Sequence, residues 1–484
     1  MRIINEKNII WLTKYNLDAI GYVFKYKNGL YRLIKKDKVQ YVRELLSKGF
    51  IKKAQKIGFL PKTRIADELQ IEGYEGCMIL QHDQTPFLII ETEWTGEMFK
   101  DAFEFILKFE LFLLREGYEL YDPHPRNVGF YGTKPIYYDF GSIIKISTDD
   151  HYGSVRSIQT TWLYKYYLIT KSRLSWESVQ KLLLMPEITR DEYSRIRNDM
   201  CFLRTLKKIH GYWDRYIDTV LSEGEDYKEY KFINILVRIG RYGKTFDVCN
   251  VKKRKKKIIN QYIRILRRSN YVRRDYRWSD YGTRNYADDD DLKIENRFKV
   301  YLEWLKDNKK EYGLVKGLEI GGNGGALGEV IVKKQILQDV CVSDYDCGAI
   351  DIGYHRCKNN VAVNRNLTFS NFNILKKDLD PNNNREKRLE SDVVIMCAVS
   401  HHLLLSQKIR LERLVDILLS YTRKILVIEF MPLGLWDGSH QSQVPDWYNL
   451  EWFLDGLRSG FEILKVEQIY KNRVAIICKK LKLQ

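Results

Sequence analysis

Two histidines and a glutamate stand at the ends of two apolar runs, where they could move a proton. Residues 391–403 read SDVVIMCAVSHHL, a β-branched run that ends in His401 and His402. Residues 423–430 read RKILVIEF and close on Glu429. Imidazole, with an ordinary pKa of about 6.5, accepts a proton close to neutral pH. We predict His402 as a general base, with His401 as the alternative. We expect Glu429 to orient the base or to bind a divalent metal together with a histidine.

A glycine-rich turn farther upstream predicts a nucleotide-type ligand. Residues 314–346 contain an apolar run, the turn GGNGG, a helix-forming segment and a second β-branched run that ends at Asp344. Glycines let the backbone approach a ligand, and an acid about 20 residues later bonds a ribose hydroxyl. Asp344 follows Gly321 by 344 − 321 = 23 residues. Asn323 departs from the usual GxGxxG pattern, and a tight loop of another α/β domain is the simpler alternative.

A second set of polar residues lies in the N-terminal half, within residues 121–142. Asp122 and Asn127 are five positions apart, as in kinase catalytic loops, and a DFG tripeptide begins at Asp139 after a short predicted hairpin. In such a site one carboxylate accepts a hydroxyl proton. Asn127 and Asp139 would hold Mg²⁺ against the phosphates of ATP. This order of residues predicts a kinase-like fold.

The phosphate-binding half of that site is incomplete. No glycine-rich loop precedes Tyr31, and no VAIK-like strand follows. Arg32 or Lys35 could pair with Glu44 on the next predicted helix, and Arg32 could stand in for the missing lysine. A planar guanidinium does not reproduce the point charge of a lysine. We therefore predict binding of ATP and Mg²⁺ with weak or absent phosphotransfer, and both an active kinase and an inactive scaffold stay open.

The C-terminal half alternates apolar runs with helical stretches. This alternation predicts an α/β fold with a parallel sheet and helices on both faces. Ligands of such sheets bind at the carboxyl ends of the strands. The side chains expected at this edge are Glu319, Asp344, Asp378, His401, His402 and Glu429.

The N-terminal half combines short β-type runs with helical stretches. An Asn-Gly pair predicts a hairpin over 21–34, and glycines at 49 and 117 predict the ends of two helices. The predicted helices cover 39–48 and 100–116, and the further predicted strands cover 74–80 and 87–91.

These patterns divide the 484 residues into two domains and a linker. We predict a kinase-like module over 1–275, with a small lobe at 1–100 and a large helical lobe at 101–275. A polar, turn-rich linker follows at 276–300 and ends in a helix that begins near Arg297. The sheet domain then occupies 301–484.

The chain is basic, with a net charge of +18. Such a charge favours anionic partners, which include nucleic acid and phosphate-bearing acceptors. The run KKRKKK at 252–257 predicts either a solvated face or a phosphate-binding strip, with Tyr262, Tyr271 and Tyr276 interleaved.

Two further features indicate the compartment. The eight cysteines form no CxxC pair, which argues against zinc and for a reducing compartment. No stretch reaches the roughly 18 apolar residues of a membrane span, and the N-terminus has no apolar leader core. We therefore expect a cytoplasmic protein. The sequence makes no prediction of the oligomeric state.

Several motifs together carry a family resemblance over roughly residues 21–479. They are EWTGEMFKDA, ELYDPHPRNVGF, KPIYYDFGS, WSDY, LEIGGNGG, VSDYD, DVVIMCAVSHHL and ILVIEF. This set resembles bacterial class I S-adenosylmethionine (SAM)-dependent methyltransferases of the nodulation host-specificity type, in which a kinase-like module precedes a Rossmann-like methyltransferase domain. The chain departs from the pattern in a shortened 434–446 region and in its basic linker.

The resemblance implies SAM as the cofactor. The expected cradle consists of Glu319, Gly321, Asn323 and Gly325. Asp344 is expected on the ribose hydroxyls, Asp346 as its substitute if the strand ends two residues later, and Asp378 on the adenine amino group.

The resemblance also implies O-methylation of a glycan or glycan-linked intermediate. The alternative is an RNA or DNA methyltransferase that binds phosphates through the basic stretch. Cys397 lacks the Pro-Cys context of cytosine methyltransferases, and no Asn/Asp-Pro-Pro motif follows the strand. A binding protein with two inactive modules is a third alternative.

Overall fold

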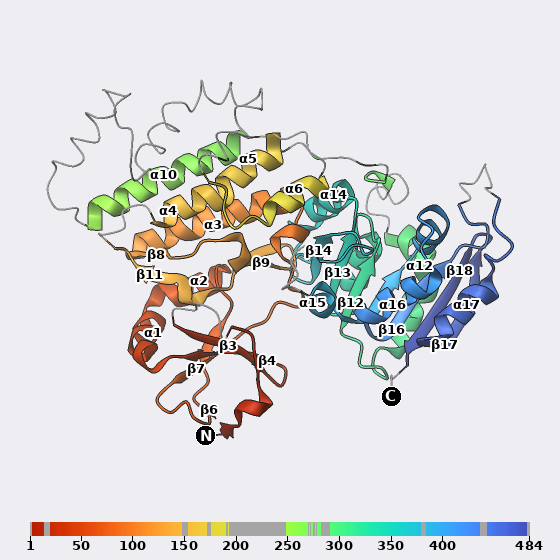
Figure 1. The fold of residues 1–484 in the computed structure, drawn as a ribbon, viewed down its shortest axis with the longest axis horizontal. Coiled ribbons are helices and arrows are strands. Elements are labelled where there is room, and N and C mark those ends of the chain that lie inside the picture. The colour runs from red at the N-terminus through yellow and green to blue at the C-terminus, as the bar shows by residue number, and fades with distance from the viewer. Residues whose placement is uncertain are drawn as a thin grey trace. The chain divides into compact units, whose positions relative to one another are not determined.

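The computed structural model describes residues 2–13, 20–147, 153–171, 176–189, 192, 248–269, 271, 273, 276, 278–281, 291–378, 384–435 and 443–481. The chain forms two compact units (Figure 1). Unit 1 consists of Met1–Gln84, Phe99–Gly129 and Pro135–Val272, and unit 2 consists of Thr85–Met98, Phe130–Lys134 and Arg273–Gln484. Two short segments of the predicted kinase-like module, 85–98 and 130–134, therefore belong to unit 2.

Unit 1 begins with a five-stranded antiparallel sheet of order β2-β3-β4-β7-β5. Its strands are β2 (Ile10–Trp11), β3 (Gly21–Tyr26), β4 (Gly29–Ile34), β5 (Thr63–Ile65) and β7 (Met78–His82). Beside it, β1 (Arg2–Ile4) pairs with β6 (Leu69–Ile71). The predicted hairpin is confirmed, although the turn is Lys27-Asn28 and Lys27 carries the positive φ of 51°. The predicted strand 74–80 is displaced to Met78–His82, because a turn occupies Glu75 and Gly76.

Two helices follow the hairpin, α1 (Val39–Ser47) and α2 (Gly49–Ile57). The first ends where predicted, but for a different reason. Lys48 is extended (φ −70°, ψ 128°) and Gly49 opens the next helix. The left-handed glycine that ends a helix is Gly58, at φ 94°.

The long apolar helix is confirmed as α3 (Gly96–Glu116), and it ends at Gly117 with φ 85°. The predicted hairpin after Asn127 is also confirmed. The elements that follow α3 are β8 (Tyr118–Leu120), β9 (Val128–Tyr131), β10 (Lys134–Tyr137), β11 (Ile143–Lys145), α4 (Gly153–Ile158), a π-helix (Gln159–Leu163), α5 (Tyr164–Lys171), α6 (Trp176–Leu183) and α10 (Val248–Arg268). The sequence predicts helices over 150–250, and within that range residues 193–247 lie outside the described residues.

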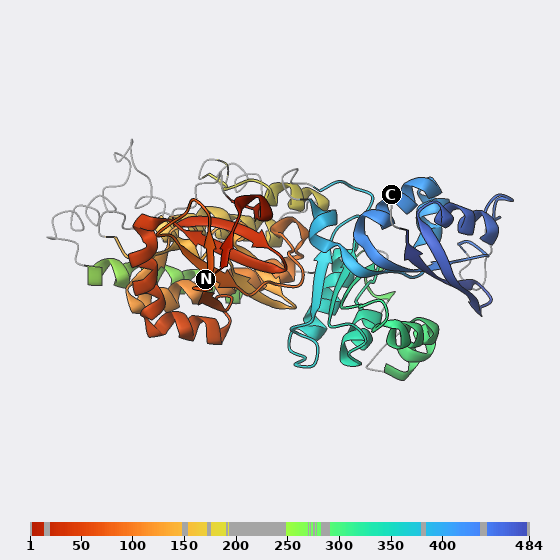
Figure 2. The ribbon, with the colours of Figure 1, turned by 90° about the horizontal axis from the view of Figure 1, so that it is seen from below.

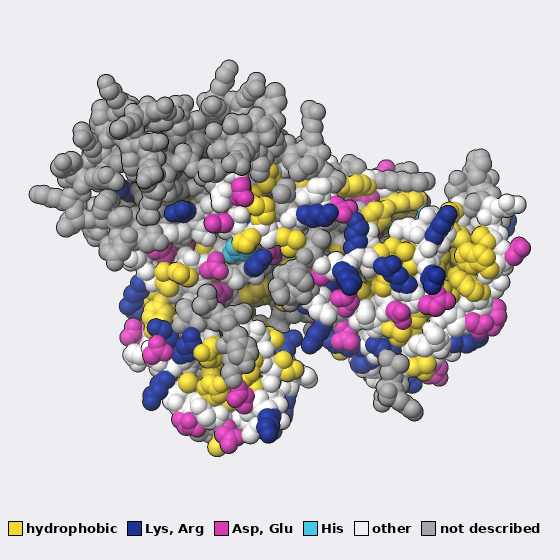
Figure 3. Space-filling view, viewed as in Figure 1, with side chains coloured by type: hydrophobic (Ala, Val, Ile, Leu, Met, Phe, Trp, Pro, Cys, Tyr) yellow, Lys and Arg dark blue, Asp and Glu magenta, His cyan; other side chains and the backbone are white. Residues whose placement is uncertain are grey.

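The basic run 252–257 lies on α10, and one face of it points inward. Lys255 is fully buried and pairs with Glu119. Lys252 donates to the carbonyl of Arg115 at 2.7 Å. The run is therefore partly a structural element of unit 1. On the face drawn in Figure 3, Lys and Arg side chains are interspersed with Asp and Glu in both units.

Unit 2 is built on a seven-stranded sheet of order β14-β13-β12-β15-β16-β18-β17. Six strands run parallel to one another: β12 (Lys316–Ile320), β13 (Asp339–Asp344), β14 (Leu367–Asn371), β15 (Ser391–Met396), β16 (Thr422–Phe430) and β17 (Phe461–Tyr470). The seventh strand, β18 (Arg473–Lys480), is antiparallel to both of its neighbours. The predicted parallel sheet is thus confirmed except for β18.

Helices cover both faces of this sheet, as predicted; α12 lies on one side and α16 on the other (Figure 2). They are α12 (Asp291–Asn308), α13 (Ala326–Lys333), α14 (Cys347–Cys357), α15 (Arg385–Leu389), α16 (Leu411–Tyr421) and α17 (Leu450–Arg458). Helix α12 packs on α13, and α16 packs on α17. Among the described residues, no helix is long and apolar enough to cross a bilayer.

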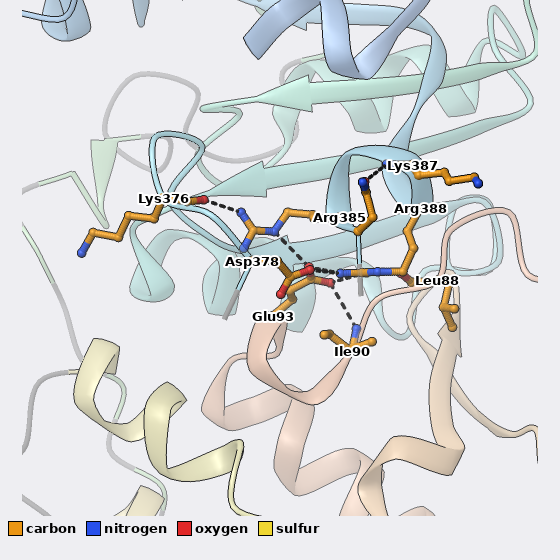
Figure 4. Close-up of polar contacts among 9 residues, drawn as sticks. Leu88, Ile90, Glu93, Lys376, Asp378, Arg385, Lys387 and Arg388 are labelled. Atoms are coloured by element: carbon orange, nitrogen blue, oxygen red, sulfur yellow. Dashed lines mark hydrogen bonds and ion pairs between the residues drawn. The ribbon is translucent and has the colours of Figure 1, made fainter. Parts of the chain in front are cut away.

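The predicted strand 87–91 is wrong, because arginine side chains take the place of a strand partner (Figure 4). Arg388 Nη1 donates to the carbonyl of Leu88 at 2.6 Å. Glu93 Oε2 accepts the backbone N–H of Ile90 at 3.1 Å. The buried Glu93 carboxylate also binds Arg385 Nε at 3.1 Å and Arg388 Nη2 at 2.7 Å. The segment is therefore fixed to α15 through side chains.

Candidate active site

The predicted glycine turn connects β12 to α13, and its backbone needs glycine. Gly321 and Gly325 have φ values of 68° and 77°. A Cβ on Gly321 would lie 2.3 Å from Val399 Cγ2, and a Cβ on Gly325 would lie 2.9 Å from Val342 Cγ2. Asn323 is also left-handed, at φ 51°. Asparagine tolerates this conformation better than most residues, which explains how Asn323 can replace the middle glycine of the GxGxxG pattern.

Asp344 is the last residue of β13 and faces the turn. Its Oδ2 accepts the N–H of Asn323 at 2.9 Å, and its Oδ1 accepts the N–H of Asp346 at 2.9 Å. Burial raises the pKa of Asp344 to about 6. The structure thus brings the predicted turn and the predicted acid together.

Asp346 has a different position from the one its predicted role requires. Asp346 was expected on the ribose only if β13 ended two residues later than Asp344. The strand ends at Asp344, so this condition is not met. Asp346 is the N-cap of α14, where its Oδ1 accepts the N–H groups of Gly348 and Ala349 at 3.0 and 3.1 Å. The same oxygen accepts the Ser279 hydroxyl at 2.6 Å.

Glu319 lies one residue before the end of β12, beneath the turn. Its Oε2 accepts the N–H of Gly328 at 3.1 Å. Burial, and then the charge of Asp344, raise the pKa of Glu319 to about 8. Glu319 is therefore protonated at neutral pH in the ligand-free protein.

Asp378 follows β14, on the carboxyl side predicted for it. Its Oδ2 binds Arg388 Nη2 at 2.9 Å, and the side chain is largely buried. Arg388 in turn holds Glu93, so Asp378 belongs to the same ionic cluster as segment 85–98 (Figure 4). Its expected contact with an adenine amino group stays a prediction.

The two histidines follow β15 at a strained corner. Ala398 has a positive φ of 55°, which is unusual for a residue with a side chain. His401 and His402 then enter a short π-helix with their ring centroids 4.1 Å apart. His401 is buried, and its pKa is lowered to about 3 by burial and by the charges of His402 and Arg473. His401 is therefore neutral, and His402 is the more accessible ring.

Glu429, near the end of β16, is fully buried and held by three donors. Its Oε1 accepts Arg297 Nη2 at 2.6 Å and the Tyr301 hydroxyl at 3.0 Å. Its Oε2 accepts Arg473 Nη1 at 2.9 Å. Both oxygens are thus committed to donors of the protein. This geometry suits an orienting group and does not suit the metal ligand that the sequence also allowed.

No group of three or more His, Cys, Asp or Glu side chains that could hold a metal occurs within the described ranges. Cys397 follows β15, and burial raises the pKa of its thiol well above the ordinary value. It therefore stays a thiol, as expected for a cysteine without the context of a nucleophile.

In unit 1 the structure brings two of the predicted kinase-like residues together. Asn127 Nδ2 donates to Asp122 Oδ2 at 3.0 Å. The buried Tyr137 lies near both Asp122 and Asp139, since the negative charges of both carboxylates help to raise its pKa.

Arg32 is buried, and its Nη2 lies 3.4 Å from Asp139 Oδ1. The predicted pair of Arg32 with Glu44 is wrong. Glu44 is exposed on α1 and accepts Gln40 Nε2 at 3.3 Å.

No protein-family model matches the chain, and no curated protein matches it. Solved structures match part of it. Magnesium protoporphyrin IX methyltransferase (ChlM) from Synechocystis PCC 6803 with bound SAM is 15% identical, and the match covers 43% of this chain and 93% of that one with a TM-score of 0.31. The N-methyltransferase NodS from Bradyrhizobium japonicum WM9 is 13% identical, with 40% and 99% covered and a TM-score of 0.30. The methyltransferase domain of bacterial CtHen1 is 11% identical, with 38% and 98% covered and a TM-score of 0.29.

Sequence patterns did not assign a role to the segment 278–281, which lies against the turn. Asn323 Nδ2 donates to the carbonyl of Trp278 at 2.7 Å, and the Trp278 ring lies 5.4 Å from that of His402. Ser279 binds Asp346. The segment is the motif WSDY of the family resemblance, which carried no role for its residues.

The partners of Glu429 were also missed. Arg297 and Tyr301 are four residues apart on α12, a spacing that places two side chains on one helix face. This spacing could have predicted that Arg297 and Tyr301 lie side by side, but nothing in the sequence connects them to Glu429.

Proposed function

We propose that unit 2 is a SAM-dependent methyltransferase. The observation that carries the proposal is the left-handed turn at 321–325 closing on Asp344 at the carboxyl ends of adjacent parallel strands. The residues fit the cofactor. The glycines leave room where a Cβ would collide, and Asp344 keeps lone pairs for ribose hydroxyls after accepting two backbone N–H groups.

We assign the chemistry of the acceptor to the corner after β15. When bound, SAM supplies a methyl group on a sulfonium; transfer breaks the carbon–sulfur bond, forms a carbon–oxygen bond and releases S-adenosylhomocysteine (SAH). His402 takes the proton of the acceptor hydroxyl, since it is the more accessible of the two rings. The buried, neutral His401 and the Trp278 ring hold His402 in place.

The acceptor we propose is a hydroxyl of a glycan or a glycan-linked intermediate. Its support is the family resemblance of the motifs. The alternative nucleic-acid acceptor gains no support from α10, where Lys255 is buried against Glu119 and Lys252 caps a carbonyl.

For unit 1 we propose a kinase-like nucleotide site. The support is the hydrogen bond between Asp122 and Asn127, together with Asp139 close to the same tyrosine. Arg32 occupies the position next to Asp139 where an active kinase would present a lysine and a metal. Phosphotransfer is therefore expected to be weak or absent.

Calorimetry with SAM tests the proposal for unit 2. Wild-type protein should bind SAM, and Asp344→Ala should bind it about tenfold to a hundredfold more weakly because charge-assisted hydrogen bonds to ribose are lost. Gly321→Val should abolish binding, because its side chain would meet Val399. The exposed Asp416→Ala on α16 is the matched control. No binding by the wild type, or unchanged binding by Asp344→Ala, would refute a SAM site here.

A further inference from the structure

The cluster around Glu429 brings two arginines to one buried carboxylate. Arg297 and Arg473 both bind this carboxylate, and Tyr301 adds a neutral donor. Positive charge at a largely desolvated position is costly unless a further anion compensates it.

The two arginines differ in the contacts that their guanidinium groups make within the protein. The guanidinium of Arg297 lies 4.5 Å from the Phe298 ring and 5.8 Å from the Tyr470 ring, in addition to its bond with Glu429. Arg473 uses Nη1 for Glu429 and for a contact of 3.9 Å with Met431 Sδ. Within the described residues its Nε and Nη2 donate to no protein group, and its side chain is 20% exposed. Nε and Nη2 form the planar edge that binds a carboxylate or phosphate with two hydrogen bonds.

Arg473 also lies at the edge of the sheet that carries the proposed site. It is the first residue of β18, and the next residue, Val474, is paired with Phe430 at the end of β16. Its charge contributes to the lowered pKa of His401, which follows β15, the strand on the other side of β16. Arg473 therefore lies at the same end of the sheet as the proposed acceptor position.

We propose that Arg473 binds an anionic group of the methyl acceptor, a carboxylate or a phosphate, beside the methylated atom. This inference rests on the proposed methyltransferase function and deepens it. Glu429 is the positioning residue, because it binds Nη1 of Arg473, while Nε and Nη2 have no protein acceptor among the described residues.

Binding of small anions to the full-length, SAH-loaded protein tests the inference. The probes are acetate and inorganic phosphate, with acetamide as the neutral control, at constant ionic strength, and binding is measured by calorimetry. Wild-type protein should bind at least one anion and not acetamide. Arg473→Gln should weaken that binding by roughly tenfold to a hundredfold. Arg473→Lys should weaken it by less, because lysine keeps the positive charge but lacks the planar edge that donates two hydrogen bonds. The exposed Arg458→Gln on α17 is the matched control and should bind as the wild type does.

The outcomes separate the two proposals. Preference for acetate supports a carboxylate on the acceptor, and preference for phosphate supports a phosphate. SAH binding without anion binding, or anion binding that Arg473→Gln leaves unchanged, overturns the inference alone. Failure of the wild type to bind SAH overturns the proposed function and this inference with it. SAH affinity of each variant also reports whether that variant is folded.

Discussion

Asp139 in unit 1 and Glu429 in unit 2 are both carboxylates held by arginine, but their surroundings differ. The Asp139 side chain is 30% exposed, and Arg32 approaches it at 3.4 Å. Glu429 is 0% exposed, and two arginines and a tyrosine contact it at 2.6–3.0 Å. An exposed carboxylate can exchange its partner for a metal ion or a phosphate-bound cation at small cost. A buried carboxylate with three donors cannot, because each donor would be left desolvated.

The comparison explains why we propose a metal role for Asp139 and not for Glu429. Asp139 shares the neighbour Tyr137 with the Asp122–Asn127 pair and is partly open to solvent, as the proposed nucleotide–Mg²⁺ site would require. Glu429 binds two arginines, and in our proposal it orients Arg473 toward the acceptor. Burial and donor count therefore separate a ligand-exchanging carboxylate from an orienting one.

The largest effect is expected from Glu429→Ala. Removing the carboxylate leaves two arginines without their anion, and we expect the free energy of unfolding to fall by about 3–5 kcal/mol. Chemical denaturation of the full chain measures it. Glu429→Gln keeps an acceptor oxygen and should lose less. A loss under about 1 kcal/mol in Glu429→Ala would show that the arginines are solvated, and would erase the contrast with Asp139.

A pH dependence is expected from Glu319, a buried carboxylate beneath the turn. Its folded pKa is about 8 against an ordinary value of 4.5, so between these pH values unfolding releases a proton. The contribution is complete below pH 4.5 and is lost as the pH rises to about 8. In the absence of SAM the free energy of unfolding should fall by up to about 1.4 kcal/mol per pH unit in this window.

Glu319→Gln should remove that slope above the pKa of Asp344, which is about 6. Denaturation midpoints collected across the pH range provide the measurement. An equally steep slope in the variant would assign the dependence to another group.

The smallest change in stability is expected from Asp139→Ala, at most about 1 kcal/mol, because the pair it breaks is partly exposed. Its effect on ligand binding should be large by comparison. Thermal shift with ATP and Mg²⁺ should show a modest stabilisation of the wild type that the variant lacks. The exposed Asp67→Ala serves as the control. A shift that survives Asp139→Ala would place the nucleotide elsewhere.

Local patterns predicted the elements whose cause is local. Glycines and β-branched runs gave the turn at 321–325, the end of β13 at Asp344 and the hairpin of β3 and β4, since each depends on a few consecutive residues. Segment 87–91 failed as a strand because its partner, Arg388, lies 300 residues beyond Leu88. The donors of Glu429 come from positions 132, 128 and 44 residues away. Hydrophobic alternation and secondary-structure propensity carry no information about partners so far away in the sequence.

The pairing of Glu93 with Arg388 has a consequence during translation. The two residues are 295 positions apart. At a synthesis rate of about 5–20 residues per second, Glu93 leaves the ribosome roughly 15–60 s before its arginine exists. Segment 85–98 therefore emerges long before the unit that buries it. An N-terminal fragment that ends before α15 would contain segment 85–98 but not the arginines that bind Glu93. This segment of unit 2 therefore needs the C-terminal part of the chain in order to be buried.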